Sequence, residues 1–321
     1  MARGLADIMT RYENLLERMK NGEQIVIDGG TGTEVERRGV PQLENAWNSG
    51  GTLSHPDIVR AIHEDYLNSG AEIIISNTFA TSRNLLEDAG VPELFEAYNR
   101  SAVELAREAR DRADKPNTVI AGGISHWSFS RRLPTLDDLR DGAADQARIM
   151  KEAGADLIML EMMVEVPRMM AVLDGALSSD LPIWVGLSCA PEKSGTMCLQ
   201  NAEADSNGFV YARDGAYLAD AISALDGYDV PLLSVMHTDV QHIDACLDVV
   251  DNYWSGLVGV YAHSGRFVDG KWGFQDTITP NAYTEACNTW LDRGVNLIGG
   301  CCGIRPDHIS HLCGARHEFI G

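Results

Sequence analysis

Short apolar runs alternate along the chain with longer stretches in which apolar residues recur every three or four positions. Continuous apolar runs are typical of strands buried on both faces, and the longer stretches are typical of amphipathic helices. The sequence predicts eight strands, at Gln24–Ile27, Glu72–Ser76, Thr118–Ala121, Asp156–Leu160, Pro182–Leu187, Pro231–Val235, Leu257–Tyr261 and Val295–Ile298. It predicts helices at Pro56–Ser69, Pro92–Ala113, Leu136–Ala153, Val166–Ser178, Asp214–Leu225, Val240–Tyr253, Pro280–Arg293 and Pro306–His317.

Capping residues mark several of these helix boundaries. Thr135 and Thr279 each stand just before a predicted helix, where a threonine hydroxyl can accept a hydrogen bond from a free backbone N–H. Gly70, Gly154 and Gly294 each lie between a helix and the next strand, where a left-handed glycine commonly ends a helix. We therefore expect the chain to leave these helices at the glycines and to enter the following strands directly.

Eight strand-then-helix units in 321 residues predict an α/β protein with a closed (β/α)8 TIM barrel. A doubly wound open sheet is the alternative with the same alternation of elements. The segment Asp28–Thr33 superficially resembles a dinucleotide-binding fingerprint, but Val35 occupies the third glycine position, so we exclude that function. We expect one barrel domain over residues 1–321, with an N-terminal helical extension over residues 1–22 in which Leu5–Lys20 forms the helix.

The acidic composition excludes several classes of partner. Asp and Glu number 47 against 26 Lys and Arg, which gives a formal net charge of −21. Nucleic acids and anionic membranes need a basic footprint, so we expect neither as a partner. No apolar run approaches the ~20 residues of a membrane span, and the charged N-terminus lacks the core of a signal peptide. The odd number of cysteines, seven, favours metal-binding or catalytic thiols, and we expect a cytoplasmic protein.

Chemically capable side chains follow the predicted strands at their C-terminal ends, where the functional groups of this kind of barrel gather. Asp28 follows the first strand and Glu161 the fourth, while His237 follows the sixth and His263 the seventh. The eighth strand runs into the adjacent pair Cys301-Cys302. We therefore expect two carboxylates, two imidazoles and two thiols to surround one mouth of the barrel.

The adjacent cysteines are the most specific signal in the chain. Consecutive side chains on a strand point in opposite directions, so one metal ion can bind both thiolates only where the backbone turns. Gly299 and Gly300 before the pair and Gly303 after it permit such a turn. Two thiolates and one nitrogen would leave a fourth position open, as in a catalytic zinc site. The alternative is that one cysteine is a small buried hydrophobe and the other is incidental.

Together with five other segments, this motif makes the sequence resemble the homocysteine S-methyltransferase family. That family includes betaine–homocysteine methyltransferase and the homocysteine module of cobalamin-dependent methionine synthase. The matching segments span nearly the whole chain in the family's order, and the last is the most distinctive. They are Asp28–Thr33, Asn77-Thr78-Phe79, Ala121-Gly122-Gly123, Glu161, Ser264-Gly265 and Ile298–Gly303.

The resemblance implies a zinc ion that holds the thiol of homocysteine as a thiolate, which then attacks an activated methyl group to give methionine. It also implies a set of substrate-binding residues. Asp28 and Glu161 would hold the ammonium group of the amino acid, and the backbone beside Gly29 would receive its carboxylate. The remaining members would line the pocket or donate hydrogen bonds; they are Asn77, Thr78, Phe79 and Ser264.

One departure from the family affects the metal site. Family members usually carry an Asn-Cys pair at the end of the sixth strand, where this chain has Met236-His237. We therefore predict that His237, Cys301 and Cys302 bind Zn²⁺, because imidazole is a good zinc ligand. His263 is a competing ligand, and a histidine held on the barrel rim by hydrogen bonds is the structural alternative for His237.

Exchanging an anionic thiolate for the neutral imidazole of His237 would leave the zinc more positive and a bound thiolate less electron-rich. The acceptor could then differ from homocysteine. The alternative function is a zinc-dependent barrel enzyme that acts on a different thiol or on a carboxylate, as a lyase or aldolase does. A third hypothesis is a non-catalytic metal-binding relative.

The methyl donor is open between betaine, S-methylmethionine and a methyl-corrinoid protein. We expect the corrinoid protein, if it is the donor, to be a separate partner. A cationic donor would require an aromatic wall, for which the candidates are Trp47, Trp127, Phe129 and Trp272. The segment Ala190–Val210 is rich in small and polar residues, and we expect it to act as a mobile lid. The oligomeric state is left open.

Overall fold

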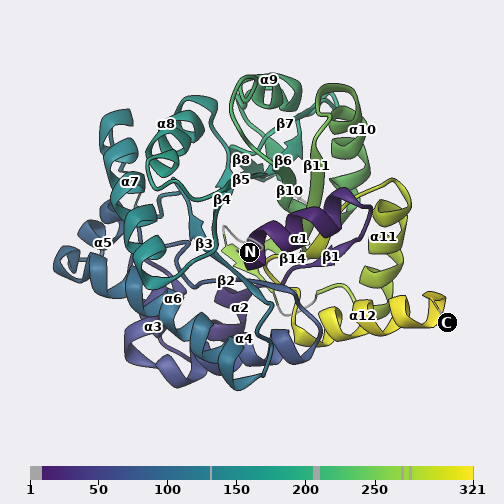
Figure 1. Cartoon of the computed structure of the whole chain (residues 1–321). Coiled ribbons are helices and arrows are strands. Elements are labelled where there is room, and N and C mark those ends of the chain that lie inside the picture. Colours follow the sequence, from purple (N-terminus) through teal and green to yellow (C-terminus); the bar gives the residue numbers. More distant parts are fainter. Residues whose placement is uncertain (1–8, 131, 205–209, 269–270, 275–276, 321) are drawn as a thin grey trace, which may run out of the picture.

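The computed structural model describes residues 9–130, 132–204, 210–268, 271–274 and 277–320. Eight parallel strands pair in the order β1-β14-β11-β10-β5-β4-β3-β2, and a parallel bridge between Ile27 and Ile73 joins the first strand to the last. The sheet therefore closes into the predicted (β/α)8 barrel (Figure 1). The strands are β1 (Ile25–Val26), β2 (Ile73–Ile75), β3 (Val119–Ile124), β4 (Leu157–Met163), β5 (Ile183–Leu187), β10 (Leu232–Asp239), β11 (Leu257–His263) and β14 (Leu297–Gly300).

Helices surround the barrel, and their boundaries follow the predicted signals (Figure 1). Thr135 closes a capping box, and Gly70, Gly154 and Gly294 have φ of 107°, 100° and 93°, which confirms the left-handed glycines. The ring helices are α4 (Pro56–Asn68), α6 (Phe95–Arg112), α7 (Leu136–Ala153), α8 (Val166–Leu177), α9 (Leu218–Ser223), α10 (Ile243–Tyr253), α11 (Pro280–Asp292) and α12 (Pro306–Ile320). None of the helices described here combines the length and the apolar character that a membrane span requires.

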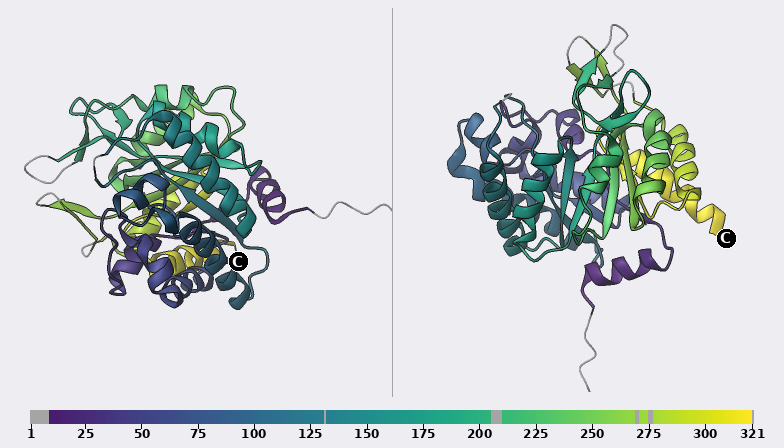
Figure 2. Two further views of the ribbon diagram at one scale, coloured as in Figure 1. Left: turned by 90° about the vertical axis from the view of Figure 1, so that its left-hand side faces the viewer. Right: turned by 90° about the horizontal axis from the view of Figure 1, so that it is seen from above.

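The N-terminal helix α1 (Arg11–Lys20) covers the barrel at the N-terminal ends of the strands. Tyr12, Leu15 and Met19 pack into the apolar cluster that fills the barrel, and the indole of Trp184 donates a 3.3 Å hydrogen bond to the Tyr12 hydroxyl. The helix begins at Arg11 rather than at the predicted Leu5, because Thr10 caps it; residues 1–8 lie outside the described chain. Figure 2 shows α1 at the end of the barrel opposite to the loops of the mouth.

Several elements were not predicted, and most of them lie at the mouth of the barrel (Figure 2). The predicted lid is partly β-structure: its described residues form antiparallel hairpins, while residues 205–209 lie outside the description. The helix predicted at Asp214–Leu225 is shorter, at Leu218–Ser223. The predicted helices at Pro92–Ala113 and Val240–Tyr253 each begin with a short 3-10 helix, η2 (Pro92–Leu94) and η3 (Val240–His242). The added elements are α2 (Thr31–Arg37), η1 (Asn48–Gly50), α3 (Gly51–Ser54), α5 (Arg83–Asp88), β6 (Cys189–Pro191), β7 (Met197–Leu199), β8 (Ala202–Ala204), β9 (Val210–Ala212), β12 (Arg266–Val268) and β13 (Lys271–Gly273).

Candidate metal centre and substrate cavity

Two β-bulges shape the mouth of the barrel. Near their C-terminal ends, β4 has one residue more than β5, and β10 has one more than β11. Met162 in the first bulge has φ of 56° and His237 in the second has φ of 41°, a region that only a few per cent of residues other than glycine adopt. Bulges commonly redirect side chains next to active sites. Glu161 and His237, one from each bulge, both line the cavity described below.

Hydrogen bonds hold the His237 bulge in its strained conformation. The Ser188 hydroxyl donates to the His237 carbonyl at 2.8 Å, and the Cys189 N–H donates to the Thr238 hydroxyl at 2.9 Å. The Met162 N–H lies 3.0 Å from the Met236 sulfur, so the two bulges contact each other. Strained backbone persists only where its surroundings over-determine it, and these bonds meet that condition.

The cysteine pair lies on a tight turn directly after β14. The Cys301 N–H donates to the Ala262 carbonyl at 2.8 Å, and the Ile304 N–H donates back to the Cys301 carbonyl at 3.0 Å. Gly303 has φ of 81°, and a Cβ at this position would lie 2.0 Å from the Ser264 carbonyl oxygen. Only glycine fits there. The turn brings the two thiols to the same side, with their sulfur atoms 3.9 Å apart.

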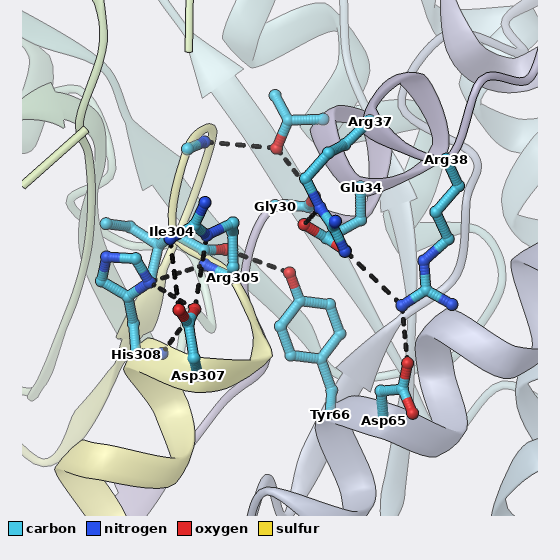
Figure 3. A network of polar contacts seen from close by, with 12 residues as sticks. Gly30, Glu34, Arg37, Arg38, Asp65, Tyr66, Ile304, Arg305, Asp307 and His308 are labelled. Atoms are coloured by element: carbon cyan, nitrogen blue, oxygen red, sulfur yellow. Dashed lines mark hydrogen bonds and ion pairs between the residues drawn. The ribbon is translucent and has the colours of Figure 1, made fainter. Parts of the chain in front are cut away.

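A polar network ties this turn to the loop after β1 (Figure 3). The Ile304 carbonyl accepts hydrogen bonds from the Tyr66 hydroxyl at 3.0 Å and from the Gly30 N–H at 2.9 Å. The Thr33 hydroxyl accepts from the Gly303 N–H at 3.2 Å and donates to the Gly30 carbonyl at 2.9 Å. These hydrogen bonds therefore fix the segment that carries the cysteines to the loop after β1.

The Thr33 bridge makes a prediction about stability. Thr33→Val keeps the shape of the side chain but leaves a buried N–H and a buried carbonyl without this partner, so we expect the free energy of unfolding to fall by about 1–3 kcal/mol. Thr31→Val is a matched control, because the buried Thr31 hydroxyl has no hydrogen-bond partner within the described part of the chain, and its removal should be neutral or stabilising. Urea denaturation of both metal-free variants measures the difference. Equal losses in the two variants would contradict the bridge.

His237, Cys301 and Cys302 form a group that could hold a metal ion. The Nδ1 atom of His237 lies 3.5 Å from the Cys301 sulfur, and one ligand atom from each residue lies within 4.8 Å of the others. A nitrogen and two sulfurs are donors that Zn²⁺ prefers, and three protein ligands leave a position open. The hydrogen-bonded neighbour Cys302, with burial, raises the pKa of the Cys301 thiol well above its usual value, although His237 opposes this. Metal-free Cys301 therefore keeps a proton that a bound cation would displace.

His263 lies behind His237 and outside this group. The two imidazole rings stack with their centroids 4.6 Å apart and their planes 24° apart. The sequence left His237 and His263 as competing ligands, and within the described chain the structure brings only His237 into reach of both cysteines. The stacked ring of His263 instead restricts the orientation of the His237 ring.

Two buried carboxyl groups lie at the same mouth. Asp28 is 1% exposed and accepts a 2.8 Å hydrogen bond from the Ile75 N–H. Burial raises its pKa well above the usual value, and the Ile75 hydrogen bond only partly offsets this. Burial also raises the pKa of Glu161 to about 8. A Cβ on Gly123 would lie 2.3 Å from the Glu161 carboxylate, so this glycine leaves the space that the carboxyl group occupies.

A cavity of about 570 Å³ opens at the mouth and contains most of the predicted site residues. Within the described chain, the cavity lining includes the three metal-binding candidates and acidic side chains, and it contains no lysine or arginine. A ligand that brings positive charge would therefore meet no opposing cation. The predicted residues in the lining are Gly29, Asn77, Phe79, Glu161, His237, Cys301 and Cys302.

Three predicted substrate-binding residues lie outside the cavity lining: Asp28, Thr78 and Ser264. The Thr78 hydroxyl donates to the Gly123 carbonyl at 2.8 Å and accepts from the Gly123 N–H at 3.0 Å. The Ser264 hydroxyl accepts from the Ile278 N–H at 2.7 Å. These two hydroxyls form hydrogen bonds within the protein. Contact of Thr78 and Ser264 with the substrate stays a prediction.

Aromatic side chains form one wall of the cavity. The Trp47 ring meets Phe79 edge-on, with centroids 6.2 Å apart, and lies 6.4 Å from the Phe129 ring. Trp127 also lines the cavity, whereas the side chain of Trp272 lies outside the described structure. The lining also includes residues that were not predicted, among them Glu36, Gln42, Met162, Tyr261 and Phe274. Tyr261 could have been found, since it stands near the end of a predicted strand.

Comparison with known proteins identifies the family. A family model described as homocysteine S-methyltransferase matches residues 25–316. The chain belongs to the homocysteine S-methyltransferase family. This membership makes it an S-methyltransferase and supports methyl transfer to homocysteine as its reaction.

Individual members of the homocysteine S-methyltransferase family align with nearly the whole chain. Homocysteine S-methyltransferase YbgG of Bacillus subtilis is 26% identical over 314 residues, which cover 90% of this chain and 93% of that protein. Betaine–homocysteine S-methyltransferase 1 of Xenopus laevis is 25% identical and covers 92% of this chain and 73% of its own length. The metallated structure of the Escherichia coli homocysteine methyltransferase MmuM, at 20% identity, covers 95% of this chain and 100% of its own with a TM-score of 0.73. This last likeness supports the fold.

Proposed function

We propose that this enzyme is a zinc-dependent methyltransferase that moves a methyl group from an activated donor to the thiolate of homocysteine, giving methionine. The observation that carries the proposal is the group of His237, Cys301 and Cys302, whose ligand atoms lie within 4.8 Å at the edge of the cavity. When bound, Zn²⁺ would supply the acidity that keeps the acceptor thiol deprotonated at neutral pH. The bulge of β10 and the turn after β14 hold the three side chains in place beforehand.

The chain's own residues would then orient the acceptor. Glu161 lines the cavity beside the metal group, and Asp28 is buried behind Glu161. The described lining contains no cation, so the ammonium group of the acceptor would supply the positive charge for these two carboxyl groups. The glycine-rich loop at Gly29 would receive the substrate carboxylate, and Asn77 and Phe79 would bound the pocket. Fixing the acceptor at both ends aligns its sulfur with the methyl carbon.

The aromatic wall favours a cationic small-molecule donor, either betaine or S-methylmethionine. The rings that line the cavity belong to Trp47, Phe79, Trp127 and Phe129, and a methylated cation over the face of such a ring is attracted by its quadrupole. A methyl-corrinoid protein would instead have to approach the mouth as a separate partner.

The test is an assay of the zinc-loaded enzyme with homocysteine and each donor in turn, with methionine measured by mass spectrometry. We expect methionine with one of the cationic donors and none after the metal is removed with a chelator. Absence of methionine with every donor, from enzyme that carries zinc, would reject homocysteine as the acceptor.

The second candidate is a zinc-dependent barrel enzyme with a different thiol or a carboxylate substrate, and His237 is the observation that favours it. A neutral imidazole leaves the cation more positive than a third thiolate would, so anionic ligands should bind more readily. Lyase or aldolase turnover of carboxylate substrates by an enzyme that forms no methionine would support this candidate.

A further inference from the structure

Tyr261 lines the cavity, and its buried hydroxyl has no hydrogen-bond partner among the residues that the structure describes. The residue lies on β11 between Met236 of β10 and Gly299 of β14, is 1% exposed, and lines the cavity. More than about 90% of buried polar groups in folded proteins are hydrogen-bonded. An exception that borders a binding cavity therefore points to a partner that arrives with the ligand.

Gly186 shows where the hydroxyl lies. A Cβ on this glycine of β5 would be 2.6 Å from the Tyr261 hydroxyl oxygen and 3.0 Å from the Leu160 carbonyl oxygen. The ring thus reaches from β11 past β10 to β5, and its polar end stops beside the residue that precedes Glu161. The glycine at position 186 leaves the space in which the hydroxyl ends.

The surroundings of this hydroxyl determine what kind of ligand group it fits. Glu161 lines the same cavity and Asp28 lies nearby, and after burial the charges of these two groups and of Cys301 raise the pKa of Tyr261 further. The phenol therefore stays neutral and offers oxygen lone pairs. No lysine or arginine belongs to the described lining, so the positive partner for this cluster of oxygens has to come from the ligand.

We propose that the Tyr261 hydroxyl accepts a hydrogen bond from the ammonium group of the acceptor, beside Glu161, and so selects thiols that carry an α-amino group. The proposal rests on the proposed function, because it concerns the acceptor of that reaction. It assigns a substrate contact to a residue on β11, whose hydroxyl ends beside Gly186 of β5 between the two bulged strands, rather than to a residue in a loop of the mouth.

The test compares Tyr261→Phe with the wild-type enzyme, both loaded with zinc. Calorimetry measures the binding of homocysteine and of 4-mercaptobutanoate, which is homocysteine without its amino group. We expect the variant to bind homocysteine about tenfold more weakly, as for a lost hydrogen bond to a charged group, and to bind 4-mercaptobutanoate unchanged. The KM for homocysteine should rise by the same factor while kcat changes less.

Thermal unfolding of the metal-free variants separates substrate binding from a structural role. Tyr261→Phe removes a hydroxyl that has no partner, so its Tm should equal or exceed that of the wild type. Tyr283→Phe is the matched control: its buried hydroxyl donates to the Gly299 carbonyl, so this variant should lose stability without discriminating between the two thiols.

Two results would overturn the assignment of Tyr261. One is a Tyr261→Phe variant that binds homocysteine as tightly as the wild type, and the other is an equal loss of affinity for both thiols. Failure of the proposed function has a different signature, namely a wild-type enzyme that methylates no homocysteine at all.

Discussion

His237→Ala should purify with little or no zinc and should form no measurable methionine. The variant retains two thiols on one turn, and a two-ligand site loses both the affinity and the geometry of the three-ligand group. Since metal binding is coupled to release of thiol protons, we expect the apparent affinity at neutral pH to fall at least about a hundredfold. Cys301→Ser should behave in the same way. Metal content measured by mass spectrometry and titration with a zinc-competing dye provide the readouts.

Two controls make this prediction specific. Cys313→Ser removes a thiol on α12 that is not a member of the group and should leave the zinc content unchanged. His263→Ala removes the stacked ring but no member of the group, so it should retain the metal. Unchanged zinc in His237→Ala would remove His237 from the site, and loss of zinc from His263→Ala alone would transfer the role to His263.

Glu161→Gln should have opposite effects on stability and on acceptor binding. Burial raises the pKa of Glu161 to about 8 in the folded chain, above its ordinary value of 4.5. The folded state therefore holds a proton that the unfolded chain releases between these values, so this group's contribution to stability is present below pH 4.5 and is lost as the pH rises to about 8. A glutamine avoids that loss. We expect the metal-free variant to unfold at a higher temperature than the wild type at pH 8, and the difference to shrink toward pH 4.5.

Binding should change in the opposite direction. The amide carries no charge, so Glu161→Gln should bind homocysteine about tenfold more weakly, the factor expected when a hydrogen bond to a charged group is lost. Glu34→Gln is the matched control for stability: that carboxylate is also buried but accepts two 2.7 Å hydrogen bonds from Arg37, so its replacement should destabilise the fold. A Glu161→Gln variant less stable than the wild type at pH 8 would contradict our account of this carboxyl group.

The barrel could be predicted from sequence because its strands are unbroken apolar runs and its helices carry their own start and stop signals. The sequence also pointed to the group that could hold a metal ion, because Cys301-Cys302 lies at a strand end between glycines. The bulges were not predicted, because Met162 and His237 adopt a positive φ that few residues other than glycine adopt and that neither residue type predicts. Tertiary hydrogen bonds, rather than local preference, impose that conformation.

The roles of hydroxyl groups were harder to predict than the positions of strands. Thr78 and Ser264 stand at strand ends as predicted, yet their hydroxyls are engaged by Gly123 and Ile278. The sequence shows Tyr261 only as the last residue of an apolar run. The structure shows that its hydroxyl lies beside Gly186 and has no partner among the described residues. Which partner a hydroxyl finds depends on contacts between distant segments, which spacing along the chain does not encode.

The position of α1 also bears on the order in which molecules reach the metal group. Because Leu15 and Met19 fill the barrel at the N-terminal ends of its strands, we expect reactants and products to enter and leave through the mouth on the opposite side. Whichever molecule sits deeper must arrive first and depart last. In the proposed reaction, an acceptor held at the strand ends would lie beneath a donor held by the aromatic loops, so the newly made thioether would leave only after the spent donor.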